Sequence, residues 1–462
     1  METYLEKLLL QIRCKKARPF ISEEIKRHIE DQIAENLSEG MDAKAAEEKA
    51  VEDMGDPIQV GISLDKIHKP KVEWKLLAIV GILSLLGILI QQSVCYHSSN
   101  YNGLSEQVQA TLQPTLTGFV ASVILGFIIM CGIYFVDYTT VAKYSKVIGF
   151  CIIVLGALCA ADLFGGPVNG MYRYIGFGMF RVSAISLLLF YIPIYGAILY
   201  KYRNGGIRAL LMSFVWLVIP VGIAFLLPHM VTAAILMISM LIQLTAAIKK
   251  GWYRVPVKKT IGILWVVSIL LPLISLFAMY SLHLLLTYQE ERIRAFLSQS
   301  GDGFYVTGIL RSFSENIALF GKSGNDVIGM LPDVNSDYIF SYIINSYGSM
   351  AGILVIGILA SLVVFIFAAA VNQKNELGTV MGIGCGMVLL LNIVLNLFGS
   401  LGLIPPASSF LPFFSVGRSN MVLCYALVGL VMSIYRYKEV YPRHVKTSQV
   451  EFKKELTIKI SL

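Results

Sequence analysis

The chain has 462 residues, of which 56% are hydrophobic and only 15% charged, and its mean hydropathy is +0.68. A soluble domain carries about 25% charged residues, so this composition excludes a soluble, disordered or fibrous protein. It is typical of a protein that crosses a membrane several times. The formal charge of +8 does not indicate nucleic-acid binding, because the basic residues lie in short loops between apolar runs, as membrane topology requires.

Residues 1–64 are predicted to form a small soluble helical domain. Apolar residues recur there every four positions and place one stripe along a helix: Ile21, Ile25, Ile29, Ile33 and Leu37. Gly40 predicts the end of that helix and Asp42 the cap of the next one, which stops at Gly55-Asp56-Pro57. We expect three short helices that pack on themselves or on a partner and carry no chemistry of their own.

Ten apolar runs follow a linker over residues 65–75. A spanning helix needs about 20 apolar residues, so the runs predict an all-α polytopic membrane domain over 76–435, with a tail at 436–462. The expected spans are 76–94, 116–136, 147–163, 180–199, 209–227, 231–248, 261–282, 350–371, 378–398 and 421–435.

Basic residues in the loops predict the orientation of these spans. Loop 249–259 carries five Lys or Arg residues, whereas loop 95–115 carries none. Lys and Arg are enriched in cytoplasmic loops, so with ten spans both termini are predicted to be cytoplasmic. The seven cysteines show no CxxC spacing and the histidines no ligand spacing, so no metal site is predicted.

The segment 283–349 is far longer than an ordinary connection, and the topology predicts that it lies outside. It mixes both signs of charge with many aromatic and aliphatic residues. Composition leaves two alternatives open, a structural cap over the helices and a site that binds an anionic headgroup and presents a carboxylate.

Five segments, in order along the chain, resemble motifs of the SEDS family, the RodA/FtsW/SpoVE type of cell-wall glycosyltransferase. They are GMYRYIGFG at 170–178, YQEERIRAFL at 288–297, LFGKSG at 319–324, LPDVNSDYIFSYI at 331–343 and PFFSVGRSN at 412–420. A shorter motif, MGDP at 54–57, is similar to the helical prefix domain of some bacterial permeases.

The resemblance implies a ten-helix protein of the bacterial cytoplasmic membrane. Its implied activity is the polymerisation of lipid II at the outer face, during cell elongation, division or sporulation. A growing glycan would pass from undecaprenyl pyrophosphate to the 4-hydroxyl of lipid II. The resemblance also implies a class B penicillin-binding protein, a transpeptidase, as a partner, together with membrane lipids.

The sequence departs from the family pattern at three places. The family's intramembrane Glu–Lys pair falls at Ala184 and Leu187, and its PDLGTA segment is replaced by residues 228–233. Two acids that follow the catalytic segment become Asn345 and Ser346. Charged residues within a bilayer are costly and usually functional, so their loss favours a divergent or specialised member.

Asp337 aligns with the family's essential Asp and is the predicted catalytic base for the sugar hydroxyl. Asp333 lies four residues earlier, so on a helix the two carboxylates would share one face, where like charges raise one pKa. The alternative interpretation is that Asp337 caps the helix that leads into the eighth span.

Four cations are candidates for binding the pyrophosphate, because Arg grips phosphate with two parallel hydrogen bonds. They are Arg173, Arg292, Lys322 and Arg418, and Arg418 stands where the family usually has Gly. For each, a solvated loop charge or a lipid-headgroup contact is the alternative. No cofactor is required, although a divalent cation could bridge pyrophosphate and carboxylate.

The sequence is compatible with three functions. The first is a peptidoglycan glycosyltransferase. The second is a scaffold without catalysis that binds lipid II or a transpeptidase, which the missing Glu–Lys pair favours. The third is a lipid transporter or flippase, which the ten spans and the permease-like prefix favour, although no inverted repeat is evident.

Overall fold

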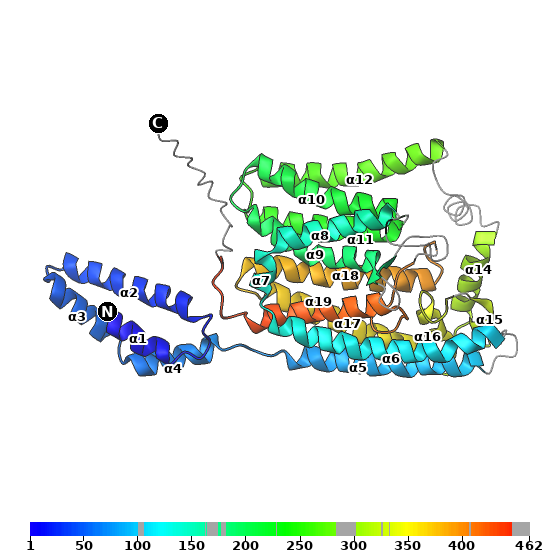
Figure 1. The fold of residues 1–462 in the computed structure, drawn as a ribbon, viewed down its shortest axis with the longest axis horizontal. Helices are drawn as coiled ribbons and strands as arrows, with labels where there is room; N and C mark the ends of the chain where they lie inside the picture. Colours follow the sequence, from blue (N-terminus) through cyan, green and yellow to red (C-terminus); the bar gives the residue numbers. More distant parts are fainter. Residues whose placement is uncertain are drawn as a thin grey trace, which may run out of the picture.

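The computed structural model describes residues 1–99, 106–161, 163, 174–176, 182–227, 229–282, 302–324, 327–331, 333–405 and 408–445. The four N-terminal helices stand at one end of a bundle of long, roughly aligned helices (Figure 1). The described part of the chain is almost entirely helical, as predicted. Its two short strands, β1 (Tyr174–Ile175) and β2 (Val182–Ser183), pair antiparallel.

The N-terminal domain has four helices: α1 (Glu2–Leu10), α2 (Arg18–Ser38), α3 (Ala43–Asp53) and α4 (Pro57–His68). Asp42 caps α3 by accepting a hydrogen bond from the backbone N–H of Ala45, as predicted. The expectation of three helices is wrong. Pro57 begins a fourth helix instead of ending the third, because Pro fits the first helical position and Asp56 caps the N–H groups of Ile58 and Gln59. The boundary expected at residue 64 therefore falls inside α4.

Long helices make up the membrane domain. They are α5 (Trp74–Ser99), α6 (Glu106–Phe135), α8 (Ser145–Ala160), α9 (Ala184–Lys201), α10 (Ile207–Leu226), α11 (Met230–Lys249), α12 (Val257–Ser281), α17 (Ser349–Val371), α18 (Glu376–Ser400) and α19 (Arg418–Arg436), with the short α7 (Tyr138–Lys143) before α8. Within the described ranges, nine helices are long and apolar enough to cross a membrane, and α8, with 16 residues, is shorter. The protein is therefore a multi-pass membrane protein.

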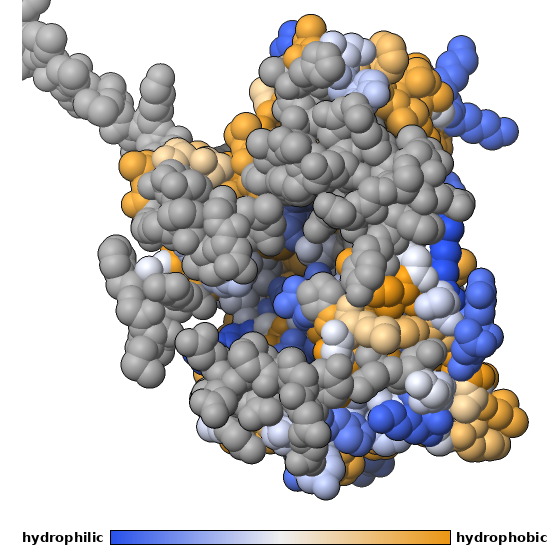
Figure 2. Space-filling view, turned by 90° about the vertical axis from the view of Figure 1, so that its right-hand side faces the viewer, coloured by the Kyte–Doolittle hydropathy of each residue, from blue (hydrophilic) through white to orange (hydrophobic). Residues whose placement is uncertain are grey.

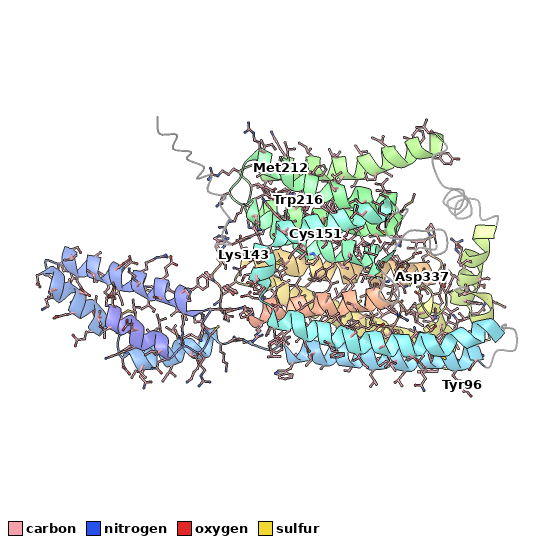
Figure 3. The ribbon with its side chains drawn as sticks, viewed as in Figure 1. Tyr96, Lys143, Cys151, Met212, Trp216 and Asp337 are labelled. Atoms are coloured by element: carbon pink, nitrogen blue, oxygen red, sulfur yellow. The ribbon has the colours of Figure 1, made fainter. Side chains whose placement is uncertain are left out.

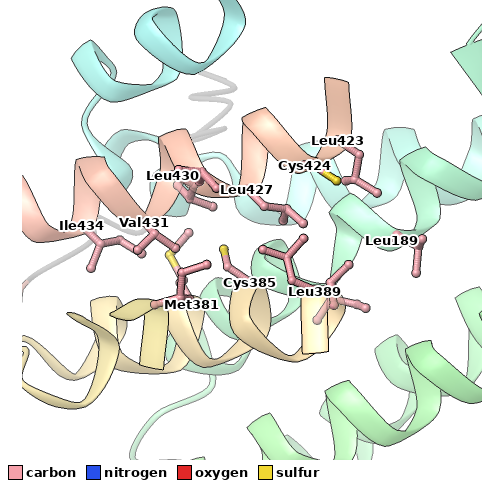
Figure 4. Packing of buried hydrophobic residues seen from close by; sticks show 14 of the residues in the cluster. Leu189, Met381, Cys385, Leu389, Leu423, Cys424, Leu427, Leu430, Val431 and Ile434 are labelled. Atoms are coloured by element: carbon pink, nitrogen blue, oxygen red, sulfur yellow. The ribbon is translucent and has the colours of Figure 1, made fainter. Parts of the chain in front are cut away.

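Three helices form the centre of the bundle. Met381, Cys385 and Leu389 of α18 face the apolar side of α19, with Leu189 of α9 nearby (Figure 4). About three quarters of the apolar stretch of each of these helices is buried, against 12% for α12. Because α18 is enclosed by protein, polar side chains on it must find partners inside the protein.

Helices α6 and α19 approach each other closely through glycines. A Cβ atom at Gly126 of α6 would overlap the Tyr425 ring of α19, and one at Gly429 would lie 2.8 Å from the carbonyl oxygen of Met130. Small residues commonly permit such close packing between membrane helices. The contact holds the middle of α19 directly against α6.

The N-terminal domain and the C-terminal segment meet at one end of the bundle. Lys16 donates a 2.7 Å hydrogen bond to the Asp137 carboxylate, which caps α7, and the backbone N–H of Lys71 donates to the carbonyl oxygen of Arg436. Asp337 lies at the opposite end (Figure 3). The two ends of the bundle are therefore chemically distinct.

The α6–α19 contact predicts different outcomes for two glycines of one helix. Gly126→Ala should lower the melting temperature in detergent, because overpacking costs about 1–3 kcal/mol. Gly132→Ala is the matched control, since no atom lies within 4 Å of its added Cβ, and it should leave the melting temperature unchanged or raised. Equal effects on thermal unfolding would contradict the close contact.

Candidate functional site

The long segment 283–349 contains folded structure. The structure describes α14 (Asp302–Glu315), α15 (Val327–Met330) and α16 (Ile339–Tyr347) within it. These helices stand at the end of the bundle remote from the N-terminal domain (Figure 1). The hydroxyl of Tyr342 on α16 is hydrogen-bonded to Ser93 and His97 of α5, at 2.9 and 2.6 Å. Burial raises the pKa of Tyr342 to about 12, so this hydroxyl keeps its proton at neutral pH.

Asp337 lies in a loop of consecutive turns, residues 333–338, that leads into α16. The prediction that Asp333 and Asp337 share a helical face is wrong, because α16 begins only at Ile339 and Asp333 has a left-handed backbone with φ of 48°. The capping alternative is also wrong: the N-cap of α16 is Tyr338, without a side-chain cap, and that of α17 is Gly348. Asp337 thus lies one residue before the N-cap position of α16.

Three successive carbonyl groups of this loop accept hydrogen bonds from outside it. Asn335 accepts from the Gln91 side chain at 2.8 Å and from the Val416 N–H at 2.9 Å. Ser336 accepts from the Ser415 hydroxyl at 2.8 Å, and Asp337 accepts from the Asn396 amide at 2.9 Å. Loops have few internal hydrogen bonds, so such partners determine their conformation. The backbone of Asp337 is therefore fixed from α5, from α18 and from segment 408–416.

The Asp337 side chain is half-buried. At its end of the molecule the surface is hollowed, and hydrophilic residues line the floor of the hollow (Figure 2). A carboxylate in partial contact with water can remain ionised and still meet a polar ligand. Asp337 is therefore partly accessible from outside the protein.

Of the candidate cations within the described residues, Arg418 follows a segment that is hydrogen-bonded to the Asp337 loop. It is the exposed first residue of α19, two positions after Val416, whose N–H bonds to the loop. Its guanidinium lies along α6, where a Cβ at Gly118 would be 3.4 Å from Nη2. The backbone just before Arg418 is thus bonded to the Asp337 loop, while the guanidinium itself lies against α6.

Lys322 lies elsewhere on the same end. It is exposed, and its turn is hydrogen-bonded to the last turn of α16, through Gly321 N–H to the Tyr347 oxygen and Ser323 N–H to the Asn345 oxygen. Asp337 precedes the first turn of that helix. Asp333 is exposed in the Asp337 loop, whereas Arg173 and Arg292 lie outside the described residues, so their roles stay predictions.

The start of α9 holds Ala184 and Leu187, the two positions at which the resemblance predicts a charged pair. Ala184 is fully buried, and the Ser186 hydroxyl donates a 2.7 Å hydrogen bond to Asn420 of α19. The backbone N–H of Ser183 also donates a 2.9 Å hydrogen bond to the Ser419 hydroxyl of α19. Neutral hydrogen bonds therefore join α9 to α19 next to Arg418.

Two residues of the site were missed by sequence reasoning. Gln91 and Asn396 are buried amides within otherwise apolar spans, and each bonds to the Asp337 loop. A polar side chain inside a span was the available signal. Among the described residues, no group of three or more His, Cys, Asp or Glu could hold a metal ion.

Comparison with known proteins places the chain in a family. The FtsW/RodA/SpoVE family profile, described as "Cell cycle protein", matches residues 73–440. The chain is 25% identical over 403 residues to the "Probable peptidoglycan glycosyltransferase FtsW" of Enterococcus hirae, covering 83% of this chain and 97% of that protein. It is 25% identical over 312 residues to the protein of the same name from Coxiella burnetii, covering 64% and 79% respectively.

Solved structures share the fold. One is described as "Structural coordination of polymerization and crosslinking by a peptidoglycan synthase complex", with a TM-score of 0.62 at 18% identity over 79% of this chain and 98% of that one. Another is the rod shape determining protein RodA of Thermus thermophilus, with a TM-score of 0.55 at 16% identity over 79% of this chain and 97% of that one. The family match confirms the resemblance drawn from the five motifs: the chain belongs to the FtsW/RodA/SpoVE (SEDS) family.

Proposed function

We propose that this protein is a peptidoglycan glycosyltransferase that polymerises lipid II at the outer face of the bacterial cytoplasmic membrane. The observation that carries the proposal is the placement of Asp337. Its loop accepts hydrogen bonds from α5, α18 and segment 408–416, at the end of the bundle remote from the N-terminal domain. The names of the relatives from Enterococcus hirae and Coxiella burnetii support the same activity.

The proposed reaction assigns one task to each charged residue. The oxygen of the lipid II 4-hydroxyl forms a bond to C1 of the growing glycan, and Asp337 accepts the proton that this hydroxyl loses. The bond from C1 to the pyrophosphate oxygen breaks, and undecaprenyl pyrophosphate leaves. Arg418 binds the departing pyrophosphate, because its fork of N–H donors fits two phosphate oxygens.

The distribution of basic residues supports an outward-facing Asp337. The end that holds the N-terminal domain also holds loop 249–259 with its five Lys and Arg residues. Lys and Arg favour the cytoplasmic side, so this end is proposed to be cytoplasmic. Asp337, at the other end, then faces the compartment in which the cell wall is built.

One observation favours a second candidate, a scaffold that binds lipid II without polymerising it. Buried Ala184 and the neutral Ser186–Asn420 bond occupy the place of a charged pair. Loss of charge near a reacting pyrophosphate weakens transition-state stabilisation. Glycan synthesis by the purified protein separates the two candidates.

Two accessory groups belong to the proposal. A class B penicillin-binding protein is the proposed partner, since a structure with this fold concerns the coordination of polymerisation and crosslinking by a synthase complex. Asp333 and Asp337 are the two carboxylates of the Asp337 loop at hand for a divalent cation. A magnesium ion commonly takes one or two carboxylates together with substrate phosphates, so the pyrophosphate would supply further oxygens.

Asp337→Asn should lower the rate of lipid II polymerisation by purified protein at least about 100-fold, because general-base catalysis contributes about 10²–10⁴. Glu315→Gln is a matched control, an exposed acid on α14 at the same end. It should leave the rate unchanged. Glycan strands separated on a gel give the measurement, and full-length product from Asp337→Asn would reject the assignment of the base.

Arg418→Ala should lower polymerisation about 10-fold or more, and Arg418→Lys should restore only part of it, since Lys keeps the charge but loses the two-pronged geometry. Lys322→Ala should have a smaller effect, because its turn bonds to the other end of α16. Initial rates at varied lipid II concentration give the comparison. A larger loss for Lys322→Ala would contradict the ranking of the two cations.

A further inference from the structure

We propose that Gln91 and Asn396 are positioning residues that hold Asp337 by bridging two loops. The first is the Asp337 loop, residues 333–338, and the second is segment 408–416. This inference rests on the proposed function, since it concerns the placement of the catalytic base. Neither residue belongs to the motifs by which the family resemblance was drawn.

Gln91 forms the first bridge, from α5. Its Nε2 donates to the carbonyl oxygen of Asn335 at 2.8 Å and to that of Phe414 at 2.6 Å. One turn earlier on α5, a Cβ at Gly87 would overlap the carbonyl oxygen of Phe413. This glycine lets α5 approach segment 408–416 closely enough for the Gln91 amide to reach both loops.

Asn396 forms the second bridge, from α18. Its Nδ2 donates to the carbonyl oxygen of Asp337 at 2.9 Å and to that of Ser409 at 2.8 Å. The side chain is 1% exposed, so water does not compete for these bonds. The bridge acts on the carbonyl group of Asp337 itself.

The chemistry of the bridge requires a primary amide. An amide –NH2 carries two donors on one nitrogen, and in both residues each donor is used on a different loop. Leu or Met of similar size provides no donor and would leave two carbonyl groups without this partner. A buried carbonyl group that loses its hydrogen-bond donor is destabilising, because its desolvation is no longer compensated. The loops would therefore shift until these carbonyl groups found other donors.

A further pair of hydrogen bonds closes the same junction. The Ser336 hydroxyl donates to the carbonyl oxygen of Val416 at 3.0 Å, and the Ser415 hydroxyl donates to that of Ser336 at 2.8 Å. The two loops are thus joined at residues 335, 336 and 337 in turn. A change in either loop moves the Asp337 carboxylate, and a displacement of about 1 Å can cost about 100-fold in rate.

Two other buried amides of the bundle provide matched controls. Asn392 lies one turn before Asn396 on α18, is 2% exposed, and donates to Val388 of its own helix at 2.8 Å. Gln243 of α11 is fully buried and donates to the carbonyl oxygen of Val380 at 2.9 Å. Both share the chemistry and burial of the bridging amides, but their amide groups donate to carbonyl oxygens of α18.

The first test is kinetic. Asn396→Leu and Gln91→Met should each lower kcat for lipid II polymerisation about 10–100-fold, with KM within about 3-fold, because the bridges act on backbone groups. Asn392→Leu and Gln243→Met should keep kcat within about 3-fold of wild type, even if their melting temperatures fall equally. If Asn396→Leu does not fold, Gln91→Met decides by the same comparison. Equal kcat losses in bridging and control variants would overturn the proposal.

The second test does not depend on activity. Hydrogen exchange measured by mass spectrometry should rise over residues 333–345 and 408–416 in Asn396→Leu but not in Asn392→Leu. Unchanged exchange over both loops would overturn the positioning role. If wild-type protein forms no glycan, the proposed function fails, and the exchange comparison alone decides whether the amides hold the loop.

Discussion

The structure depends on one constraint at the end of the bundle remote from the N-terminal domain: the carbonyl groups of residues 335–337 need donors that the loop itself cannot supply. A loop of turns satisfies few of its own backbone groups, and beside a membrane bundle an unpaired group is costly. Here α5, α18 and segment 408–416 supply the donors. The backbone that carries one carboxylate is thereby held by residues more than 50 positions away on either side in the sequence.

The bundle provides the rigidity that such a site needs. Glycines at the α6–α19 contact bring the helices together, and α9, α18 and α19 enclose the centre. Arg418 is the first residue of α19, and its guanidinium lies against α6 at Gly118, so the same packing fixes where this cation stands. A closely packed interior transmits displacement. A change in helix packing would therefore alter the geometry of the proposed reaction.

The sequence predicted the membrane helices well and the site only in part. Apolar length identified the spans, and five motifs indicated the family, because both signals are local. The conformation around Asp337 was mispredicted as helical, since its turns depend on Gln91, Asn396 and Ser415, which lie far from it in the sequence. Helix α4 was missed because Pro57 can end one helix or begin another.

A structure of the Asp337→Asn variant with bound lipid II tests the central claim most directly. The account predicts that the side chain of residue 337 lies about 2.6–3.2 Å from the 4-hydroxyl oxygen of the acceptor sugar, within reach for proton transfer. The claim would be contradicted if residue 337 reached the acceptor hydroxyl neither directly nor through one bridging water.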